Sequence, residues 1–194
     1  MYHNPDGSQS LCGNGCRAAI RFAERLHLAS SKTDFAAYDG SHSAVIEGDT
    51  IRLSMSDVQF GRQVGDGIFL DTGSPHYVLF VDSVENVDVI GEGRKWRYSD
   101  QFEAGANVNF VQIMSDSHVK VRTYERGVEN ETLSCGTGVT AVALACSLRG
   151  MSAPISIEAK GGNLKVGFNV GNEKYEDVWL EGPAEHVFSG NISL

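Results

Sequence analysis

The sequence predicts a mixed α+β fold with two similar lobes, each a curved sheet around one central helix. Two observations predict it. The motif CGNG at residues 12–15 returns as CGTG at residues 135–138, and each copy leads into an apolar helical pattern followed by short strands. A repeat of this kind indicates two lobes related by a pseudo-twofold axis. An apolar helix also needs a sheet that wraps around it, because one flat layer leaves part of its surface in water.

The first half predicts one helix followed by three strands. Apolar side chains recur with helical period over residues 13–28, and small residues near the start would let this helix lie deep inside a sheet. The period then changes to two, which predicts strands at 33–38, 43–47 and 50–54. Gly48-Asp49 lies between the last two and is typical of a hairpin turn.

The second half repeats this order with more strands. Alternating patterns predict strands at 67–72, 76–82, 107–114, 118–125, 155–159, 163–170, 175–180 and 185–188. Residues 83–102 carry a weaker helical pattern, interrupted by Gly91 and Gly93. Residues 138–148 are almost wholly apolar, which predicts a helix that is buried on all sides.

Composition indicates a globular protein and argues against two classes of partner. The chain has 194 residues, of which 41% are hydrophobic and 21% are charged. Its net charge of −9 disfavours binding to a nucleic-acid backbone or to an anionic membrane surface. No apolar run approaches the length that spans a bilayer, and the N-terminus does not read as a signal peptide. We therefore expect a cytoplasmic location.

The four cysteines fall into two kinds. Cys12 and Cys135 each precede a predicted helix, where the helix dipole and backbone N–H groups lower the pKa of a thiol from about 8.5 toward neutrality. Alone, each could equally be a small residue in a tight turn, but matching positions in two motifs favour a functional pair. Cys16 and Cys146 fall within apolar helical patterns and are expected in the core. No zinc-type spacing is present, so we expect free thiols rather than disulfides.

The glycines of both motifs suit the binding of a carboxylate. Without side chains they let a ligand approach the backbone, with N–H groups directed at it. These glycines are Gly13, Gly15, Gly136 and Gly138. Two helix N-termini that converge would hold an anion strongly. The pattern is not the dinucleotide-binding motif, because the third glycine of that motif is absent.

Other polar residues could bind the rest of an amino acid. Glu125 and Arg126 are adjacent at a strand end and could bind an ammonium and a carboxylate, although a solvated ion pair is the commoner role. His76 could orient or polarise a thiol, or could be an ordinary hydrogen-bonded histidine. Asn4 and Asn107 could bind a polar substrate or serve in turns.

Two thiols at one carboxylate site suit the removal and return of a proton at Cα. Zinc binding is disfavoured because helix N-termini repel a cation. A cysteine–histidine hydrolase needs one nucleophile and leaves the second cysteine unexplained, and a dithiol redox couple usually uses cysteines close together in sequence. In a two-base reaction, one thiolate removes the proton, the opposite thiol returns one, and backbone N–H groups stabilise the carbanion-like transition state.

With these motifs, the chain resembles the diaminopimelate epimerase family over nearly its whole length. The most specific stretches are NPDGS at 4–8, CGNG at 12–15, ERG at 125–127 with ET at 131–132, and SCGTG at 134–138. The resemblance implies a cofactor-independent interconversion of LL- and meso-2,6-diaminopimelate, in lysine and peptidoglycan precursor synthesis. It implies a small-molecule amino-acid substrate, with neither nucleic acid nor membrane as partner, and is compatible with a homodimer.

At the reacting centre, the resemblance implies that Cys12 and Cys135 are the acid/base pair and that His76 lies near their thiols. Four further residues would hold the carboxylate of the reacting centre through their backbone. They are Gly13, Asn14, Gly136 and Thr137.

At the distal end of the substrate, the resemblance implies that Asn4, Asn107 and Arg126 hold the second carboxylate. Glu125 would bind the distal ammonium. The family usually has Asn where Ser74 stands in this sequence, so we expect a weaker or water-mediated contact there.

The resemblance also implies two barrel-like lobes, with the last strand returning to the first lobe. We expect the first lobe at residues 1–57, completed by a C-terminal strand at 183–194, and the second lobe at 58–182. The family's N-terminal strands, which carry an Asn-Asp-Phe motif, are absent before Met1. We therefore expect an incomplete first lobe, and a fragment or truncated gene model whose activity is in doubt.

Two rival functions stay open. One is a proline or hydroxyproline racemase-like enzyme, in which the first motif typically has His where Asn14 stands and a smaller pocket would not need Arg126 paired with Glu125. The other is a non-catalytic module that binds an amino acid. Proton exchange at Cα of diaminopimelate and of proline separates the two enzymes, and comparison with a chain that has the N-terminal strands restored tests the non-catalytic module.

Overall fold

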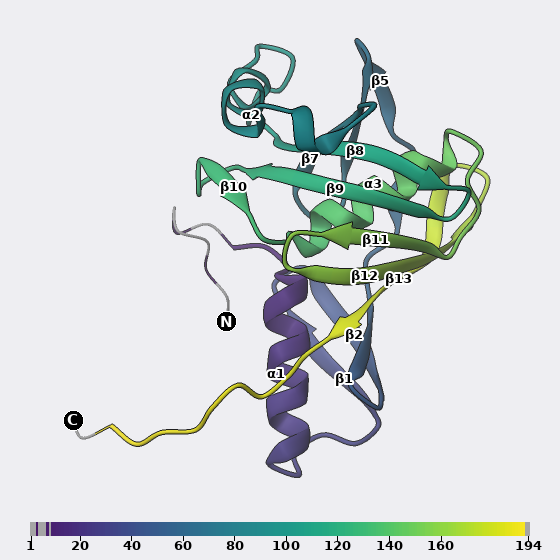
Figure 1. The fold of residues 1–194 in the computed structure, drawn as a ribbon. Coiled ribbons are helices and arrows are strands. Elements are labelled where there is room, and N and C mark those ends of the chain that lie inside the picture. The colour runs from purple at the N-terminus through teal and green to yellow at the C-terminus, as the bar shows by residue number, and fades with distance from the viewer. Residues whose placement is uncertain (1–2, 4–6, 8, 193–194) are drawn as a thin grey trace.

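One long, curved sheet runs through the molecule (Figure 1). The computed structural model describes residues 3, 7 and 9–192. The main path of the sheet has the order β1-β2-β3-β13-β12-β11-β9-β8-β7-β6-β5, with β4 paired to β13 and β10 paired to β9. The pairs β7–β8 and β9–β11 are parallel and the other pairs are antiparallel, so the sheet is mixed. The predicted α+β class is confirmed.

The strands have these bounds: β1 Lys32–Ala37, β2 Gly40–Glu47, β3 Thr50–Ser54, β4 Val58–Gln59, β5 Arg62–Val64, β6 Gly67–Asp71, β7 Pro75–Phe80, β8 Asn107–Ser115, β9 His118–Glu125, β10 Asn130–Thr132, β11 Ile155–Ala159, β12 Gly162–Val170 and β13 Lys174–Pro183. The helices are α1 Gly13–Arg25, α2 Val89–Arg97 and α3 Gly136–Ser147, with a 3-10 turn at Val84–Asn86. The expected hairpin at Gly48-Asp49 is confirmed, because Glu47 pairs with Thr50.

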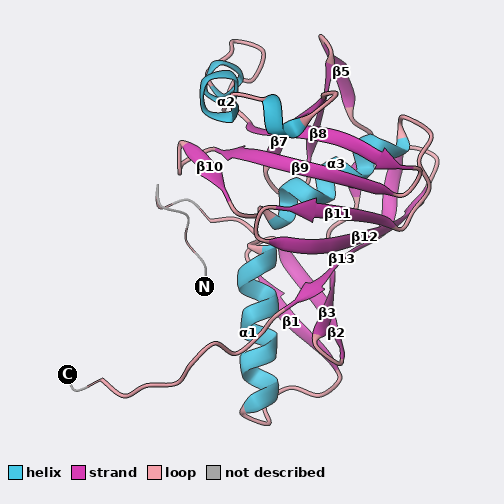
Figure 2. Cartoon of the chain, viewed as in Figure 1, coloured by secondary structure: helices cyan, strands magenta, loops and turns pink. Residues whose placement is uncertain are grey.

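Helix α3 is enclosed by the curved sheet, as Figure 2 shows. Every residue from Gly136 to Cys146 is buried. Its apolar residues are small or medium in size, so strands can approach the helix from several directions. The wholly apolar sequence of this segment therefore predicted its position correctly.

Helix α1 packs differently, because strands cover only one of its faces. Gly13, Arg17 and Ile20 are its buried residues, and the helix packs on β3 and β13. Phe22 is 61% exposed and Leu26 is 50% exposed. In the part of the chain that the structure describes, a sheet therefore covers one side of this helix, as expected for an incomplete first lobe. Its apolar pattern indicated a helix but not how many sides would be covered.

Strand β13 connects the two halves of the sheet. Along one edge it pairs with β12, and along the other it pairs first with β4 and then with β3. It ends at Pro183, and residues 184–192 form no strand. The strand expected at 185–188, and the described part of the one expected at 183–194, are therefore not formed. Arg21 contacts only the start of this segment, where its Nε donates to the carbonyl of Ala184 at 3.1 Å.

The glycines of the weak helical pattern at 83–102 are explained by packing. A Cβ on Gly93 would lie 2.4 Å from Cβ of Tyr124, so only glycine lets α2 approach β9 here. Gly91 donates its backbone N–H to the helix-capping Asp88 at 3.0 Å. The glycines therefore allow this helix to pack closely against the sheet.

Two further findings concern the helices and the cysteines of the described residues. None of their helices is long and apolar enough to cross a membrane. All four cysteines are free thiols, as expected, and Cys146 is buried in the core.

Candidate active site

The candidate site lies where the N-termini of α1 and α3 meet. Gly13 and Gly136 make this meeting possible. A Cβ on Gly136 would lie 3.0 Å from the Cα of Gly13, and a Cβ on Gly13 would lie 2.8 Å from a methyl carbon of Leu180. Both helices therefore direct their unpaired N–H groups and positive dipole ends toward one place.

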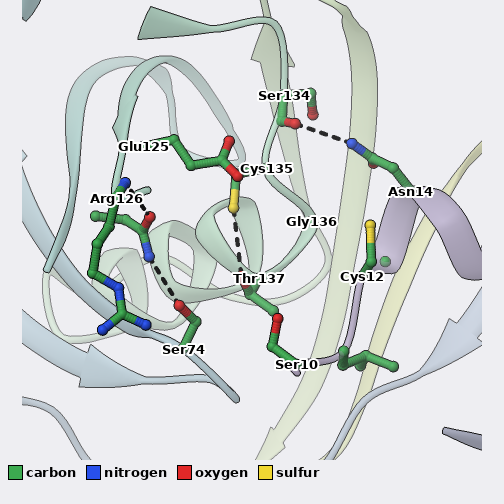
Figure 3. A pocket seen from close by; sticks show the side chains of 13 residues that line it. Ser10, Cys12, Asn14, Ser74, Glu125, Arg126, Ser134, Cys135, Gly136 and Thr137 are labelled. Atoms are coloured by element: carbon green, nitrogen blue, oxygen red, sulfur yellow. Dashed lines mark hydrogen bonds between the residues drawn. The ribbon is translucent and has the colours of Figure 1, made fainter. Parts of the chain in front are cut away.

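A pocket opens at this meeting point and contains both motif cysteines (Figure 3). Its volume is about 70 Å³. Its lining residues are Ser10, Leu11, Cys12, Gly13, Asn14, Ser74, Asn107, Glu125, Arg126, Ser134, Cys135, Gly136 and Thr137. Larger hollows occur elsewhere on the described surface, including one of about 620 Å³. The larger hollow lacks both thiols, so chemistry rather than size identifies the site.

The two thiols lie at equivalent positions but have different hydrogen bonds. Cys12 caps α1, and its sulfur accepts from the backbone N–H of Gly15 at 3.3 Å. Cys135 stands at the cap position of α3, and its sulfur lies 3.4 Å from Oγ1 of Thr137.

The expected lowering of the thiol pKa is wrong for Cys135. Burial of the thiol raises its pKa to about 11, and the nearby Glu125 carboxylate adds to this effect. The hydrogen bond with Thr137 acts in the opposite direction. In this enclosed position, the loss of water outweighs the favourable field of the helix N-terminus. Cys135 therefore holds its proton at neutral pH.

His76 lies behind Cys135 and does not contact either thiol directly. It is fully buried, and its Nε2 lies 2.9 Å from Oγ1 of Thr137. Burial, with a further contribution from the Arg126 charge, lowers the pKa of His76 to about 3. The imidazole is therefore neutral over the physiological range of pH.

Asn107 holds the loop at the other end of the pocket. Its Oδ1 accepts from the backbone N–H of Arg126 at 2.9 Å, and its Nδ2 donates to Oγ of Ser74 at 2.9 Å and to the carbonyl of Pro75 at 3.0 Å. Ser74, which stands in place of the expected Asn, thus contacts Asn107. The side chain of Asn107 is largely committed to positioning its neighbours.

Arg126 and Glu125 supply charge on this side of the pocket. The guanidinium of Arg126 donates from Nη1 to the carbonyl of Ala104 at 3.1 Å, which leaves other N–H groups for a ligand. Figure 3 shows both side chains on the side of the pocket opposite Cys12. The pocket therefore has one region lined by thiols and N–H groups, and another lined by one acid and one base.

Asn14 connects the two cysteine loops. Its Nδ2 donates to the carbonyl of Ser134 at 3.0 Å, and its Oδ1 accepts from Nη2 of Arg17 at 2.9 Å. Arg17 is only 6% exposed. The Asn14 side chain thus has a structural contact in addition to the backbone role expected of it.

The structure brings together all but one of the expected site residues. Asn4 lies outside the described residues. Ser10 and Ser134 also line the pocket, and the sequence interpretation gave them no role; Ser134 directly precedes Cys135, which was the available signal. Asn109 was also missed, although it lies two residues after Asn107 and therefore on the same face of the strand.

Metal chemistry finds no support in this arrangement. No cluster of three or more His, Cys, Asp or Glu side chains suited to a metal ion occurs among the residues described. The chemistry available at the site is that of two thiols, backbone N–H groups and the Glu125–Arg126 pair.

Comparison with known proteins gives a consistent result. A model of the family described as diaminopimelate epimerase matches residues 68–187. The chain is 48% identical to a diaminopimelate epimerase of Flavobacterium psychrophilum, in an alignment that covers 99% of this chain and 77% of the relative. It is 39% identical to a diaminopimelate epimerase of Chlorobaculum tepidum, covering 100% of this chain and 79% of the relative.

Solved structures with the same fold come from more distant proteins. A probable proline racemase of Agrobacterium radiobacter superimposes with a TM-score of 0.72 at 14% identity, covering 98% of this chain and 70% of that one. A hydroxyproline epimerase of Agrobacterium vitis gives a TM-score of 0.67 at 15% identity, covering 92% and 66%. At this identity the likeness concerns the fold alone.

Proposed function

Because the chain belongs to the diaminopimelate epimerase family, we propose that it interconverts LL- and meso-2,6-diaminopimelate by moving a proton at one Cα. One observation carries the proposal. Cys12 and Cys135 stand at the N-termini of two converging helices and line one pocket, which also contains Glu125 and Arg126.

The carboxylate at the reacting centre would bind between the two helix N-termini. The N–H groups available there belong to residues 13–14 of α1 and 136–137 of α3. Their partial positive charge stabilises an anion, and more so as negative charge spreads from Cα onto the carboxylate in the transition state. This environment would provide the stabilisation that a cofactor supplies in other racemases.

The two thiols would transfer the proton. As a thiolate, Cys12 removes the Cα proton, so that the C–H bond breaks, its electron pair stays on the substrate and an S–H bond forms. Cys135 holds a proton because its pKa is raised, and gives that proton to the opposite face of the carbon. The sulfur roles are reversed after this turnover, and the next reaction runs in the other direction.

The distal end of the substrate would lie against Glu125 and Arg126. The guanidinium would bind the second carboxylate and Glu125 would bind the second ammonium. Proline has neither group at that distance from its Cα. This pair therefore favours diaminopimelate over a proline-like substrate, despite the likeness in fold to proline racemases.

Deuterium exchange at Cα tests the proposal. The purified chain is incubated in deuterated water with diaminopimelate or with proline, and label at Cα is measured by mass spectrometry. We expect label in diaminopimelate only. Label in proline alone would favour a proline racemase-like enzyme, and label in neither would favour a non-catalytic binding module.

Variants of the two cysteines test the assignment of roles. We expect Cys12→Ser and Cys135→Ser each to reduce epimerisation by about 100-fold or more, since each removes a general acid or base. Cys146→Ala is the matched control, because Cys146 lies in the core and outside the pocket. Equal activity of either serine variant and the control would refute the two-thiol mechanism.

A further inference from the structure

A buried row of polar side chains extends from Cys135 into the protein. The sulfur of Cys135 lies 3.4 Å from Oγ1 of Thr137, and that oxygen lies 2.9 Å from Nε2 of His76. On the other side of the imidazole ring, Nδ1 of His76 lies 3.2 Å from Nδ2 of Asn109. The row ends at Thr123, whose hydroxyl donates to Oδ1 of Asn109 at 3.0 Å. All but Cys135 are at most 5% exposed.

The orientation of the Asn109 amide is fixed by its neighbours. Its Nδ2 lies 3.3 Å from the carbonyl oxygen of Tyr77, which can only accept a hydrogen bond. Its Oδ1 accepts from the Thr123 hydroxyl. The atom that faces His76 must therefore be the amide nitrogen, which can only donate.

The orientation of Asn109 determines where His76 carries its proton. Since Nδ1 accepts from Asn109, the proton of the neutral imidazole is on Nε2, which donates to Oγ1 of Thr137. The hydroxyl hydrogen of Thr137 is then available to the sulfur of Cys135. The hydrogen bonds that join Thr123, Asn109, His76 and Thr137 thus each have one direction.

We propose that Asn109 is a positioning residue that fixes the Nε2-protonated tautomer of His76 and thereby directs the Thr137 hydroxyl to donate to Cys135. The tautomer follows from the contacts alone. Its consequence for catalysis rests on the proposed function. When Cys135 must act as the base, a donated hydrogen bond stabilises its thiolate against burial and against the Glu125 charge.

The other charged and titratable groups around this row do not reverse its direction. Glu125 and Cys12 face Cys135, and both raise its pKa. Arg126 acts on His76 and helps to keep it neutral. No group in this set would hold a proton on Nδ1 of His76.

Gly138 allows the row to lie directly against the first turn of α3. A Cβ at this position would lie 2.9 Å from Oδ1 of Asn109 and 3.2 Å from Cε1 of His76. The absence of a side chain therefore lets both groups pack against the helix that begins with Cys135. This contact accounts for the second glycine of the second motif.

Nitrogen NMR of the histidine-labelled chain tests the tautomer without substrate. The His76 signals are identified by their loss in His76→Gln. In the unchanged chain we expect a neutral ring with a proton on Nε2 and none on Nδ1. In Asn109→Asp the carboxylate cannot donate, so we expect a proton on Nδ1. A ring protonated on Nδ1 in the unchanged chain would overturn the proposal, whether or not any variant folds.

Alkylation of the thiols tests the effect on Cys135. Rates with iodoacetamide are followed separately for Cys12 and Cys135 by peptide mapping. In Asn109→Leu, which adds no charge, we expect Cys135 to react several-fold more slowly, since about one hydrogen bond to its thiolate is weakened. Cys12 should react at an unchanged rate.

Asn163→Leu is the matched control, because Asn163 is exposed on β12, and β11 separates that strand from the strands that carry the row. We expect it to leave both thiols unchanged. Equal slowing of both thiols in Asn109→Leu, or of neither, would overturn the proposal. Because neither measurement uses substrate, failure here is distinct from failure of the proposed function.

Discussion

Cys12 and Cys135 occupy the same place in their motifs, but their surroundings give them different properties. Cys12 accepts a backbone hydrogen bond from its own helix. Cys135 is paired with a hydroxyl, lies near Glu125 and has a raised pKa because of burial. The repeat in the sequence predicted two equivalent thiols, whereas burial and the nearby Glu125 favour the protonated form of Cys135 in the ligand-free site.

The influence of Glu125 on Cys135 gives a first prediction. In Glu125→Gln the nearby negative charge is lost, so the pKa of Cys135 falls and its alkylation rate begins to rise at lower pH. Near pH 8.5 we expect Cys135 to react about threefold faster. The loss of one negative charge a few ångströms away in a partly solvated site increases the thiolate population by about that factor. Glu103→Gln, an exposed position, is the control. An unchanged pH profile for Cys135 would contradict the role given to Glu125.

Arg126 gives a second prediction, which concerns substrate binding. In Arg126→Gln the distal carboxylate loses its charged partner, so we expect KM for diaminopimelate to rise about 10- to 100-fold, as the loss of a charge-assisted hydrogen bond would cause. The value of kcat should change less, since the reacting carbon lies at the other end of the pocket. Arg62→Gln, on edge strand β5, is the control. A fall in kcat with unchanged KM would place Arg126 at the reacting centre instead.

Helix α3 and strand β9 could be predicted well because their patterns have a single interpretation. The apolar run of α3 can be satisfied only inside a core. The alternation in β9 matched the strand bounds at both ends, His118 and Glu125. The motif glycines were expected to let a ligand approach the backbone, and the structure adds that Gly13 and Gly136 let the two helix starts approach each other.

The parts that could not be predicted depend on contacts between distant segments. The tertiary fold sets where β13 ends, and it sets the hydrogen bond from Asn14 to the carbonyl of Ser134. Helix α2 was obscured because Gly93 reads locally as a helix breaker, and its reason is Tyr124 on another strand. The direction of the His76 hydrogen bonds likewise needed the position of Asn109.

The contact between α1 and α3 gives a third prediction, at the scale of these elements. In Gly136→Ala the added Cβ would press on the Cα of Gly13, so the two helix N-termini must separate. We expect a loss of about 1–3 kcal/mol in the free energy of unfolding, as overpacking typically causes. The rate of deuterium exchange at Cα of diaminopimelate should also fall, because the N–H groups of both helices would no longer converge on the carboxylate.

Gly167→Ala is the control for this change, since an added Cβ there meets nothing within 4 Å. Both variants are compared by urea denaturation and by the exchange assay. If Gly136→Ala matched Gly167→Ala in stability and in exchange, the close contact would not determine the geometry of the site.

At the scale of the whole molecule, the two halves of the sheet serve the site differently. The second half encloses α3, which begins just after Cys135, while β13 and β3 support α1 from one side only. Three of the four thiols are nevertheless in surroundings that disfavour a charge. The pKa is raised to about 11 for Cys16, about 11 for Cys135 and about 12 for Cys146, chiefly by burial.

These raised values make stability depend on alkaline pH. Below the ordinary thiol pKa of about 8.5, folded and unfolded chains both hold these protons, and the three thiols contribute no pH dependence. Above it, the unfolded chain releases protons that the folded chain retains, so the free energy of unfolding falls as pH rises toward the folded values. The fall approaches roughly 1.4 kcal/mol per pH unit for each thiol that the fold keeps protonated.

Cys146→Ala isolates one of these contributions and gives the fourth prediction. The substitution removes a small side chain from a buried helix, so we expect a pH-independent loss of stability of about 1 kcal/mol. Between about pH 9 and pH 11, its free energy of unfolding should fall less steeply than that of the unchanged chain, by up to roughly 1.4 kcal/mol per pH unit. Urea denaturation at several pH values measures both slopes. Since buried tyrosines titrate alike in both chains, parallel slopes would show that Cys146 does not resist ionisation in the folded core.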